Sequence, residues 1–150
     1  MPKKYPLPSC LSGKVSQEAY ERWLRRRAQA HVKRDRKRDN KSAVGQVYRD
    51  AIHRAVIESD GRDAYTGTEL DWTLISKYAN ASSKDQKRLY KHSFASLPTV
   101  DHIGDGTGAA EFKICSWRTN DAKHDLPLSE FLSVCQAVLE HHGYVVTKRS

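Results

Sequence analysis

The stretch from Leu97 to Asp125, LPTVDHIGDGTGAAEFKICSWRTNDAKHD, constrains the fold of this chain more than any other. Residues 97–100 have the composition of a short strand. The glycine-rich segment 104–108 predicts a loop, and residues 112–117 alternate apolar and polar side chains as a half-buried strand does. The stretch therefore predicts two short strands joined by a flexible connection.

Polar side chains gather where these strands end. Asp101 and His102 follow the first strand directly. After the second strand Thr119 is a good N-cap, so a helix is expected to begin at Asn120. Asn120 and His124 are four residues apart, a spacing that places two side chains on one helix face, where they could share a divalent ion. Successive strand residues point to opposite faces, so Asp101 and His102 can take different roles.

This order of residues resembles the HNH (ββα-metal) nucleases. The resemblance rests on Asp101-His102, on the strand 112–114 and on the helix opening at Asn120. It implies that His102 is the general base for the attacking water. It also implies that Asp101 and Asn120 hold one Mg²⁺ or other divalent ion, such as Mn²⁺. His124 fits either a third metal ligand or an ordinary histidine on the helix surface.

The chain departs from the family pattern at two places. Glu111 stands nine positions before Asn120, where the family has its middle asparagine, and an ionised glutamate cannot donate a hydrogen bond. Many members carry paired cysteines that bind a structural zinc. Here Ser116 and Thr119 take those places and the upstream counterpart is the segment 63–67, so no structural zinc is expected. The resemblance covers about residues 60–135.

The chemistry of phosphodiester hydrolysis independently favours these residue types. A hard divalent ion with few protein ligands neutralises the phosphoryl oxygens and assists the leaving oxygen. A neutral imidazole, with a reference pKa of about 6.5, can deprotonate the attacking water. The pattern therefore combines a metal site with a proton acceptor.

Positive charge is concentrated in one segment of the chain. The net charge is +8 and the isoelectric point about 9.5, and the residues from Arg22 to Lys41 are densely basic. Such a stripe is usually a solvated helix face, but beside a nuclease-like motif it favours contact with nucleic-acid phosphates. Arg118 and Lys123 flank the motif and are candidate contacts for the scissile phosphate or ordinary surface charges. The candidates in the stripe are Arg26, Arg27, Lys33, Arg34, Arg36, Lys37 and Arg38.

The 150 residues predict one compact domain in three parts. Residues 1–15 read as an extended, proline-stiffened arm, residues 16–59 as a basic helical region, and residues 60–150 as the nuclease core with a C-terminal helix. The expected helices are capped by Ser16, Ser42 and Ser129, with a further basic helix over 81–94. No apolar run is long enough for a membrane span, and the three cysteines match no disulfide or zinc framework, which suits a reducing cytoplasm.

The sequence thus predicts a mostly helical α+β domain built around a ββα-metal motif with a short antiparallel hairpin. The expected function is divalent-metal-dependent cleavage of DNA. One such site cuts one strand, so double-strand cleavage would require a homodimer or two events. Two other classes stay open, because Glu111 departs from the motif: a non-catalytic nucleic-acid-binding module on a degenerate HNH scaffold, and a basic scaffold protein that binds acidic partners.

Overall fold

The structure, a computed structural model, describes residues 3–77, 92–104 and 106–150. In this part of the chain it is an α+β fold with one antiparallel hairpin, so the predicted class is confirmed. The bounds of its elements are η1 (Ser9–Leu11), α1 (Gln17–Lys37), α2 (Gly45–Ser59), η2 (Trp72–Ser76), β1 (Pro98–His102), β2 (Phe112–Ser116), α5 (Trp117–Lys123) and α6 (Leu128–His141).

The long helix α1 forms where its local signals predict it. The Ser16 side chain accepts a hydrogen bond from the Ala19 backbone N–H at 3.1 Å and so caps the first turn. Its buried side chains recur at helical spacing and form one stripe, which packs against α2 and the hairpin: Tyr20, Trp23, Leu24, Ala28, His31, Val32 and Asp35. The opposite side carries the basic residues, so one helix both builds the core and presents positive charge.

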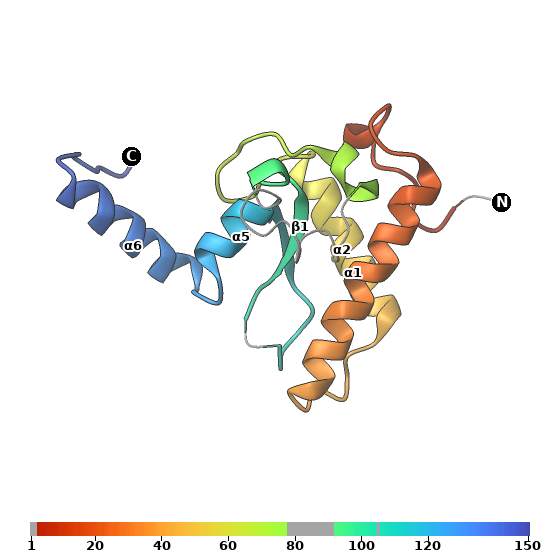
Figure 1. Cartoon of the computed structure of the whole chain (residues 1–150). Helices are drawn as coiled ribbons and strands as arrows, with labels where there is room; N and C mark the ends of the chain where they lie inside the picture. The colour runs from red at the N-terminus through yellow and green to blue at the C-terminus, as the bar shows by residue number, and fades with distance from the viewer. Residues whose placement is uncertain (1–2, 78–91, 105) are drawn as a thin grey trace.

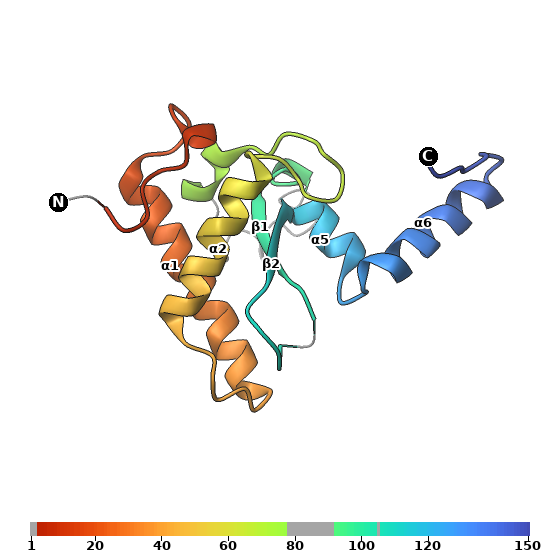
Figure 2. The same cartoon turned by 180° about the vertical axis from the view of Figure 1, so that it is seen from behind.

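The hairpin lies between two layers of helix, with α1 and α2 on one side and α5 on the other (Figures 1 and 2). β1 and β2 pair so that Val100 faces Ile114 and His102 faces Phe112. Alternate residues of a strand point to opposite faces, so each face of the hairpin contacts a different helical layer. Because both faces are covered, β1 is buried from Pro98 to Asp101 although the segment contains polar residues.

Several predicted helix boundaries are wrong by a few residues. The second helix is capped at Val44 rather than Ser42, whose side chain instead donates to Asn40 Oδ1 at 2.7 Å. The C-terminal helix begins at Leu128 after Pro127, not after Ser129. Serine is a common N-cap residue, but the Ser42 side chain is bonded to Asn40 and Pro127 directly precedes the C-terminal helix, so each helix starts at another residue. The helix predicted over 81–94 falls mainly outside the described residues.

The N-terminal arm is fastened to the helices. The Tyr5 hydroxyl donates to Asp50 on α2 at 2.6 Å, and Gln17 bonds the backbone of both Tyr5 and Leu7. Leu11, in η1, is fully buried. The arm therefore adds to the core instead of extending into solvent. In the described ranges no helix has the length and apolar character that crossing a bilayer requires.

The helix α6 differs from the rest because it extends away from the body of the protein (Figures 1 and 2). None of its residues is buried. Cys135 in α6 is only half-buried, whereas Cys115 in β2 is fully buried. Residues 144–146, which follow α6, form no strand, and Tyr144 and Val145 are exposed.

Candidate functional site

The two adjacent residues at the end of β1 face opposite layers of the fold. The Asp101 carboxylate points toward α5, where it contacts Lys123. The His102 ring points toward α1 and α2, where it contacts Asp35 and packs against Tyr48. The sequence predicted that adjacent strand residues would separate in this way. The structure therefore places the candidate metal ligand and the candidate base on different sides of one strand.

Asp101 is buried in a network with a cation and a phenol. Lys123 Nζ lies 2.9 Å from Asp101 Oδ2, and both side chains are under 10% exposed. The Tyr65 hydroxyl donates to the same carboxylate oxygen at 2.5 Å, and the Lys123 ammonium lies 5.3 Å from the centroid of the Tyr65 ring. Burial and the hydrogen bond to Asp101 raise the pKa of Tyr65, so it remains a donor. The carboxylate thus has both a charge partner and a hydrogen-bond donor.

Lys123 does not take the surface position that its candidate role as a phosphate contact requires. Its side chain is buried against Asp101. Arg118, the other candidate beside the motif, is exposed on α5 and remains accessible to a ligand. The local sequence contained no signal that separates these two cations, because the pairing of Lys123 depends on contact with a distant strand.

The helix that carries Asn120 begins earlier than predicted. Ser116 is the N-cap of α5 and accepts from the Thr119 backbone N–H at 3.0 Å, so Thr119 is not the cap. Asn120 lies three residues before Lys123, on neighbouring parts of one helix face, and it is half-buried. Because Lys123 contacts Asp101, this side of α5 is directed at β1. The predicted pair of Asp101 and Asn120 therefore comes from two elements that pack together.

His124 does not share a helix face with Asn120. It ends α5 with a left-handed φ of 52°, and its imidazole is 81% exposed beside Asp125. The prediction that Asn120 and His124 lie one above the other on a continuing helix is wrong. A third ligand at His124 would require a different conformation of this turn, and the structure favours the surface alternative.

On its other face, the strand end carries a buried histidine-aspartate contact. His102 Nε2 lies 3.0 Å from Asp35 Oδ2, and their side chains are 8% and 1% exposed. The Tyr48 hydroxyl donates to the same Asp35 oxygen. The imidazole packs edge-to-face on Phe112 with ring centroids 4.8 Å apart. Among the described residues neither ring nitrogen of His102 has a hydrogen-bond partner, and Nε2 is the one that lies in charge contact with Asp35.

His31, one helical turn before Asp35, stacks on His102 with ring centroids 5.9 Å apart. Burial, followed by the nearby charges of Arg34, His102 and Arg27, lowers the pKa of His31 to about 3. His31 is therefore neutral at physiological pH. Neither His31 nor Asp35 was singled out from the sequence. The available signal was a carboxylate within the otherwise apolar stripe of α1, since a buried charge requires a partner.

A third buried carboxylate, Asp63, occupies the place considered for a zinc site. Its Oδ2 accepts hydrogen bonds from the Ser116 backbone at 3.0 Å and the Thr119 hydroxyl at 2.7 Å. Its Oδ1 accepts from the backbones of Tyr65 at 2.8 Å and Thr66 at 3.2 Å. Burial raises the pKa of Asp63, but these hydrogen bonds outweigh it and the net shift is downward. Asp63 therefore joins the turn before the hairpin to the start of α5.

Glu111, at the position of the departure from the family motif, is exposed. Its backbone carbonyl accepts from the Ile103 N–H at 2.9 Å and so closes the end of the hairpin. The loop that follows β1 is tied to the connection between α1 and α2, where the Asn40 side-chain amide donates to the Gly106 carbonyl at 2.7 Å. Support for the strand end thus comes from α1 and its connection to α2.

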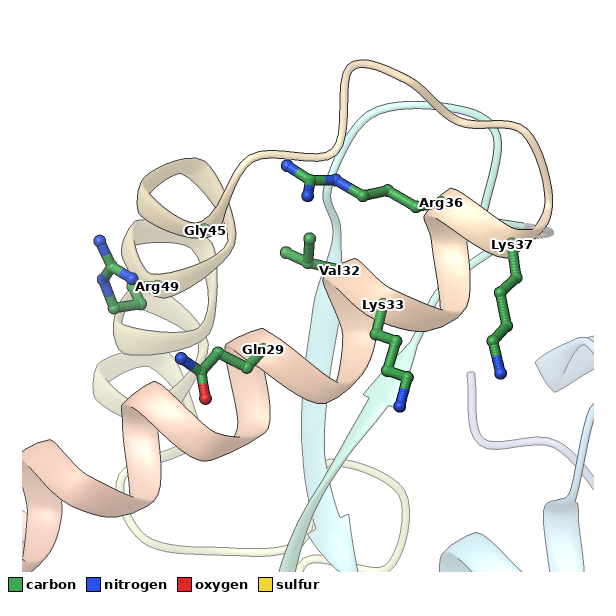
Figure 3. Close-up of a pocket in the computed structure, with 7 residues that line it drawn as sticks. All are labelled: Gln29, Val32, Lys33, Arg36, Lys37, Gly45 and Arg49. Carbon is green, nitrogen blue, oxygen red and sulfur yellow. The ribbon is translucent and has the colours of Figure 1, made fainter.

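The predicted basic stripe surrounds a hollow between α1 and α2. The hollow has a volume of about 610 Å³ and is lined by Gln29, Val32, Lys33, Arg36, Lys37, Gly45 and Arg49. Lys33 and Lys37 project from α1 while Arg36 reaches toward the connection to α2, where its Nε donates to the Ala43 carbonyl at 3.1 Å (Figure 3). Of the other candidates, Arg26, Arg34 and Arg38 are exposed and Arg27 is half-buried.

The side chains of Asp101 and Asn120 offer the types of oxygen atom that a hard divalent ion binds. Such ions prefer carboxylate and amide oxygens and keep several waters, so Asp101 and Asn120 could be sufficient protein ligands. The carboxylate already holds a cation, the Lys123 ammonium, which a metal ion would have to replace. In the described ranges no three histidine, cysteine, aspartate or glutamate side chains converge on a metal position.

Comparisons with protein-family models, curated proteins and solved structures found no match to this chain.

Proposed function

We propose that this protein is a divalent-metal-dependent endonuclease that hydrolyses phosphodiester bonds in DNA and belongs with the HNH nucleases. The main support is the packing of α5 on the hairpin. Asp101 at the end of β1 contacts Lys123 on the side of α5 that also carries Asn120. A carboxylate and an amide from these two elements are the ligands that the sequence motif requires.

Each residue of the site then has a defined role. Asp101 and Asn120 would hold a Mg²⁺-type ion, which would neutralise charge on the phosphoryl oxygens. Neither ring nitrogen of His102 has a hydrogen-bond partner among the described residues, but Nε2 lies beside Asp35, so we assign acceptance of the proton of the attacking water to Nδ1. Asp35 faces the other nitrogen, orients the ring and offsets the positive charge that forms on it. His102 is 8% exposed and lies on the face of β1 opposite Asp101, so action of the base and the ion on one phosphate requires α1 and the strand end to separate locally.

The basic hollow provides the sequence-independent contact with the DNA backbone. Lys33, Lys37 and Arg49 line it, and Arg34 and Arg38 are exposed on the same helix end as Lys37. Phosphate neutralisation by such side chains releases counterions and makes binding fall steeply with salt. Asp35, which contacts His102, belongs to this part of α1, so DNA held there lies close to the candidate base.

The decisive experiment is nicking of supercoiled plasmid with Mg²⁺ or Mn²⁺, in the presence and absence of EDTA. His102→Ala is expected to abolish cleavage and to retain salt-sensitive DNA binding. The control is His92→Ala, because His92 is exposed and outside this site. Cleavage by His102→Ala at the wild-type rate would exclude His102 as the base. Unchanged metal dependence in both Asp101→Ala and Asn120→Ala would exclude the ligand pair.

A second candidate is a non-catalytic nucleic-acid-binding module, and a specific observation favours it. Asp101 is already neutralised by a buried lysine, and His102 is enclosed against Asp35. Under this proposal both contacts are structural and only the basic surface is functional. The plasmid assay would then show salt-dependent binding without nicking at any metal concentration. Either role agrees with a cytoplasmic protein whose cysteines Cys10, Cys115 and Cys135 are free.

A further inference from the structure

The C-terminal helix α6 carries a large apolar surface that the rest of the described chain does not cover. Seven of the ten large exposed apolar side chains of the described residues belong to α6 or the residues just after it. They are Leu128, Leu132, Val134, Val138, Leu139, Tyr144 and Val145. A large exposed apolar surface of this kind marks an interaction site.

Most of the apolar residues of α6 lie on one side of the helix. Six of them follow the spacing of three and four residues that forms a single stripe: Leu128, Phe131, Leu132, Cys135, Val138 and Leu139. The charged residues Glu130 and Glu140 lie on the opposite side. Cys135 is central in the stripe, because it lies near the middle of the helix and, in angle, between the leucines on one side and Phe131 and Val138 on the other.

The C-terminal end of α6 is well formed although none of the residues of the helix is buried. Gly143 adopts a φ of 92°, and the backbone of Tyr144 donates to the Leu139 carbonyl at 3.0 Å, as in a Schellman cap. An isolated helix of about this length is only marginally stable in water. The capped helix is therefore expected to gain much of its stability from a partner that covers the stripe.

Charge limits what that partner can be. The chain carries a net charge of +8, yet residues 124–147 contain no lysine or arginine, and α6 itself bears two glutamates. This segment offers no cations to nucleic-acid phosphates or to an anionic lipid surface. It is also the part of this basic protein where two copies can approach with the least repulsion between positive charges.

We propose that the stripe on α6 binds the same stripe of a second copy of this chain, with the two helices antiparallel about a twofold axis. Such an isologous interface needs only one self-complementary patch, which the uncharged stripe provides. The axis passes next to Cys135. Packed helices are about 8–10 Å apart, so the two Cys135 side chains face each other within reach of a disulfide.

The expected dimer is reversible. A helix of this length spans about 21 Å at 1.5 Å per residue. A pair of such helices buries less than the roughly 1,600 Å² of a standard interface, so dissociation on dilution is expected. The exposed Tyr144 and Val145 extend the apolar surface beyond the helix end.

Sedimentation velocity over a concentration series, without DNA, tests the dimer independently of any nuclease activity. Leu132→Glu removes one apolar contact from each copy and adds repulsion, so it should weaken dimerisation by more than about 100-fold. Ser133→Glu adds the same charge on the opposite side of the helix and should leave the dimer intact. Leu132 is 57% exposed in the single chain, so its substitution spares the core.

Mild oxidation provides a second measurement of the geometry. In a Cys10→Ser variant, Cys115 is buried and Cys135 is the cysteine left accessible. The proposal predicts a covalent dimer linked through Cys135 that forms faster as protein concentration rises. A monomer at every concentration would overturn the proposal. So would a dimer that Leu132→Glu leaves unchanged, including one formed through another surface.

Discussion

Replacement of Lys123 by methionine is the sharpest probe of the buried pair beneath the hairpin. Methionine retains most of the volume but leaves the Asp101 carboxylate buried without its ammonium partner. Removing one member of a buried ion pair typically costs about 3–5 kcal/mol. The Tyr65 hydroxyl still donates to Asp101, so we expect a loss near the lower end, about 3 kcal/mol.

Thermal unfolding in EDTA measures this loss. For a chain of this size about 3 kcal/mol corresponds to a decrease in Tm of roughly 6–12 °C. The matched control is Lys113→Met, since Lys113 pairs with Asp101 in the hairpin register but its side chain is exposed. Adding Asp101→Asn to the Lys123→Met variant removes the uncompensated charge and should recover most of the lost stability. Equal Tm values for Lys123→Met and Lys113→Met would refute the stabilising role of the pair.

The same variant separates the two proposed functions. If a divalent ion can replace the ammonium, Mg²⁺ should stabilise Lys123→Met more than the wild type. At ten times its dissociation constant the ion would contribute about 1.4 kcal/mol. The Asp101→Asn double variant should lose this response. A Tm of Lys123→Met that does not respond to Mg²⁺ or Mn²⁺ would contradict metal binding at Asp101 and favour the non-catalytic module.

Three other predictions concern acid stability, the turn before the hairpin and DNA binding. The pKa of His31 is about 3 in the folded chain, below its reference of 6.5, so falling pH favours proton uptake by the unfolded state. The free energy of unfolding that neutral His31 contributes therefore falls by about 1.4 kcal/mol for each pH unit below 6.5. In urea unfolding, the stability of His31→Phe should depend less steeply on pH than that of the wild type. Asp63→Ala orphans buried donors of Ser116 and Thr119 and should cost about 2–4 kcal/mol in urea unfolding, whereas an effect under about 0.5 kcal/mol would contradict its bridging role. Lys33→Gln with Lys37→Gln should reduce the slope of log affinity against log salt by about 2, and an unchanged slope would place DNA elsewhere.

Local signals predicted the elements of the fold well. The Ser16 cap and the apolar stripe that follows it are sufficient to predict α1, because capping and amphipathic spacing act within a few turns. The alternation in 112–117 predicted β2, which ends one residue earlier at Ser116, and the glycine-rich segment 104–108 predicted the loop that joins the two strands. Both glycines have positive φ, a conformation that glycine adopts with little strain.

Contacts between distant residues account for most of what the sequence did not predict. Threonine is a common N-cap residue, but the Thr119 hydroxyl donates to Asp63, and α5 begins three residues before the predicted start at Asn120. Lys123 resembles a surface phosphate contact until the fold brings Asp101 against it. Asp35 is far from His102 in sequence, and only the packing of α1 on the hairpin joins them. The periodicity of apolar residues identifies which face of a helix or strand is buried, but it does not identify the polar side chain that this face will contact.

The same contacts connect the stability of the fold with its proposed chemistry. A two-stranded hairpin is only marginally stable by itself. Here two buried carboxylate contacts hold its end, one with each helical layer. Asp101 joins β1 to α5 through Lys123, and Asp35 joins α1 to β1 through His102. Catalysis would require a metal ion to replace the Lys123 ammonium at Asp101, and it would require water to reach the His102 ring. A nuclease built this way would lose stability at both contacts when it opens, so metal and DNA together must supply the compensating free energy. This coupling predicts an enzyme that is inactive until both are bound.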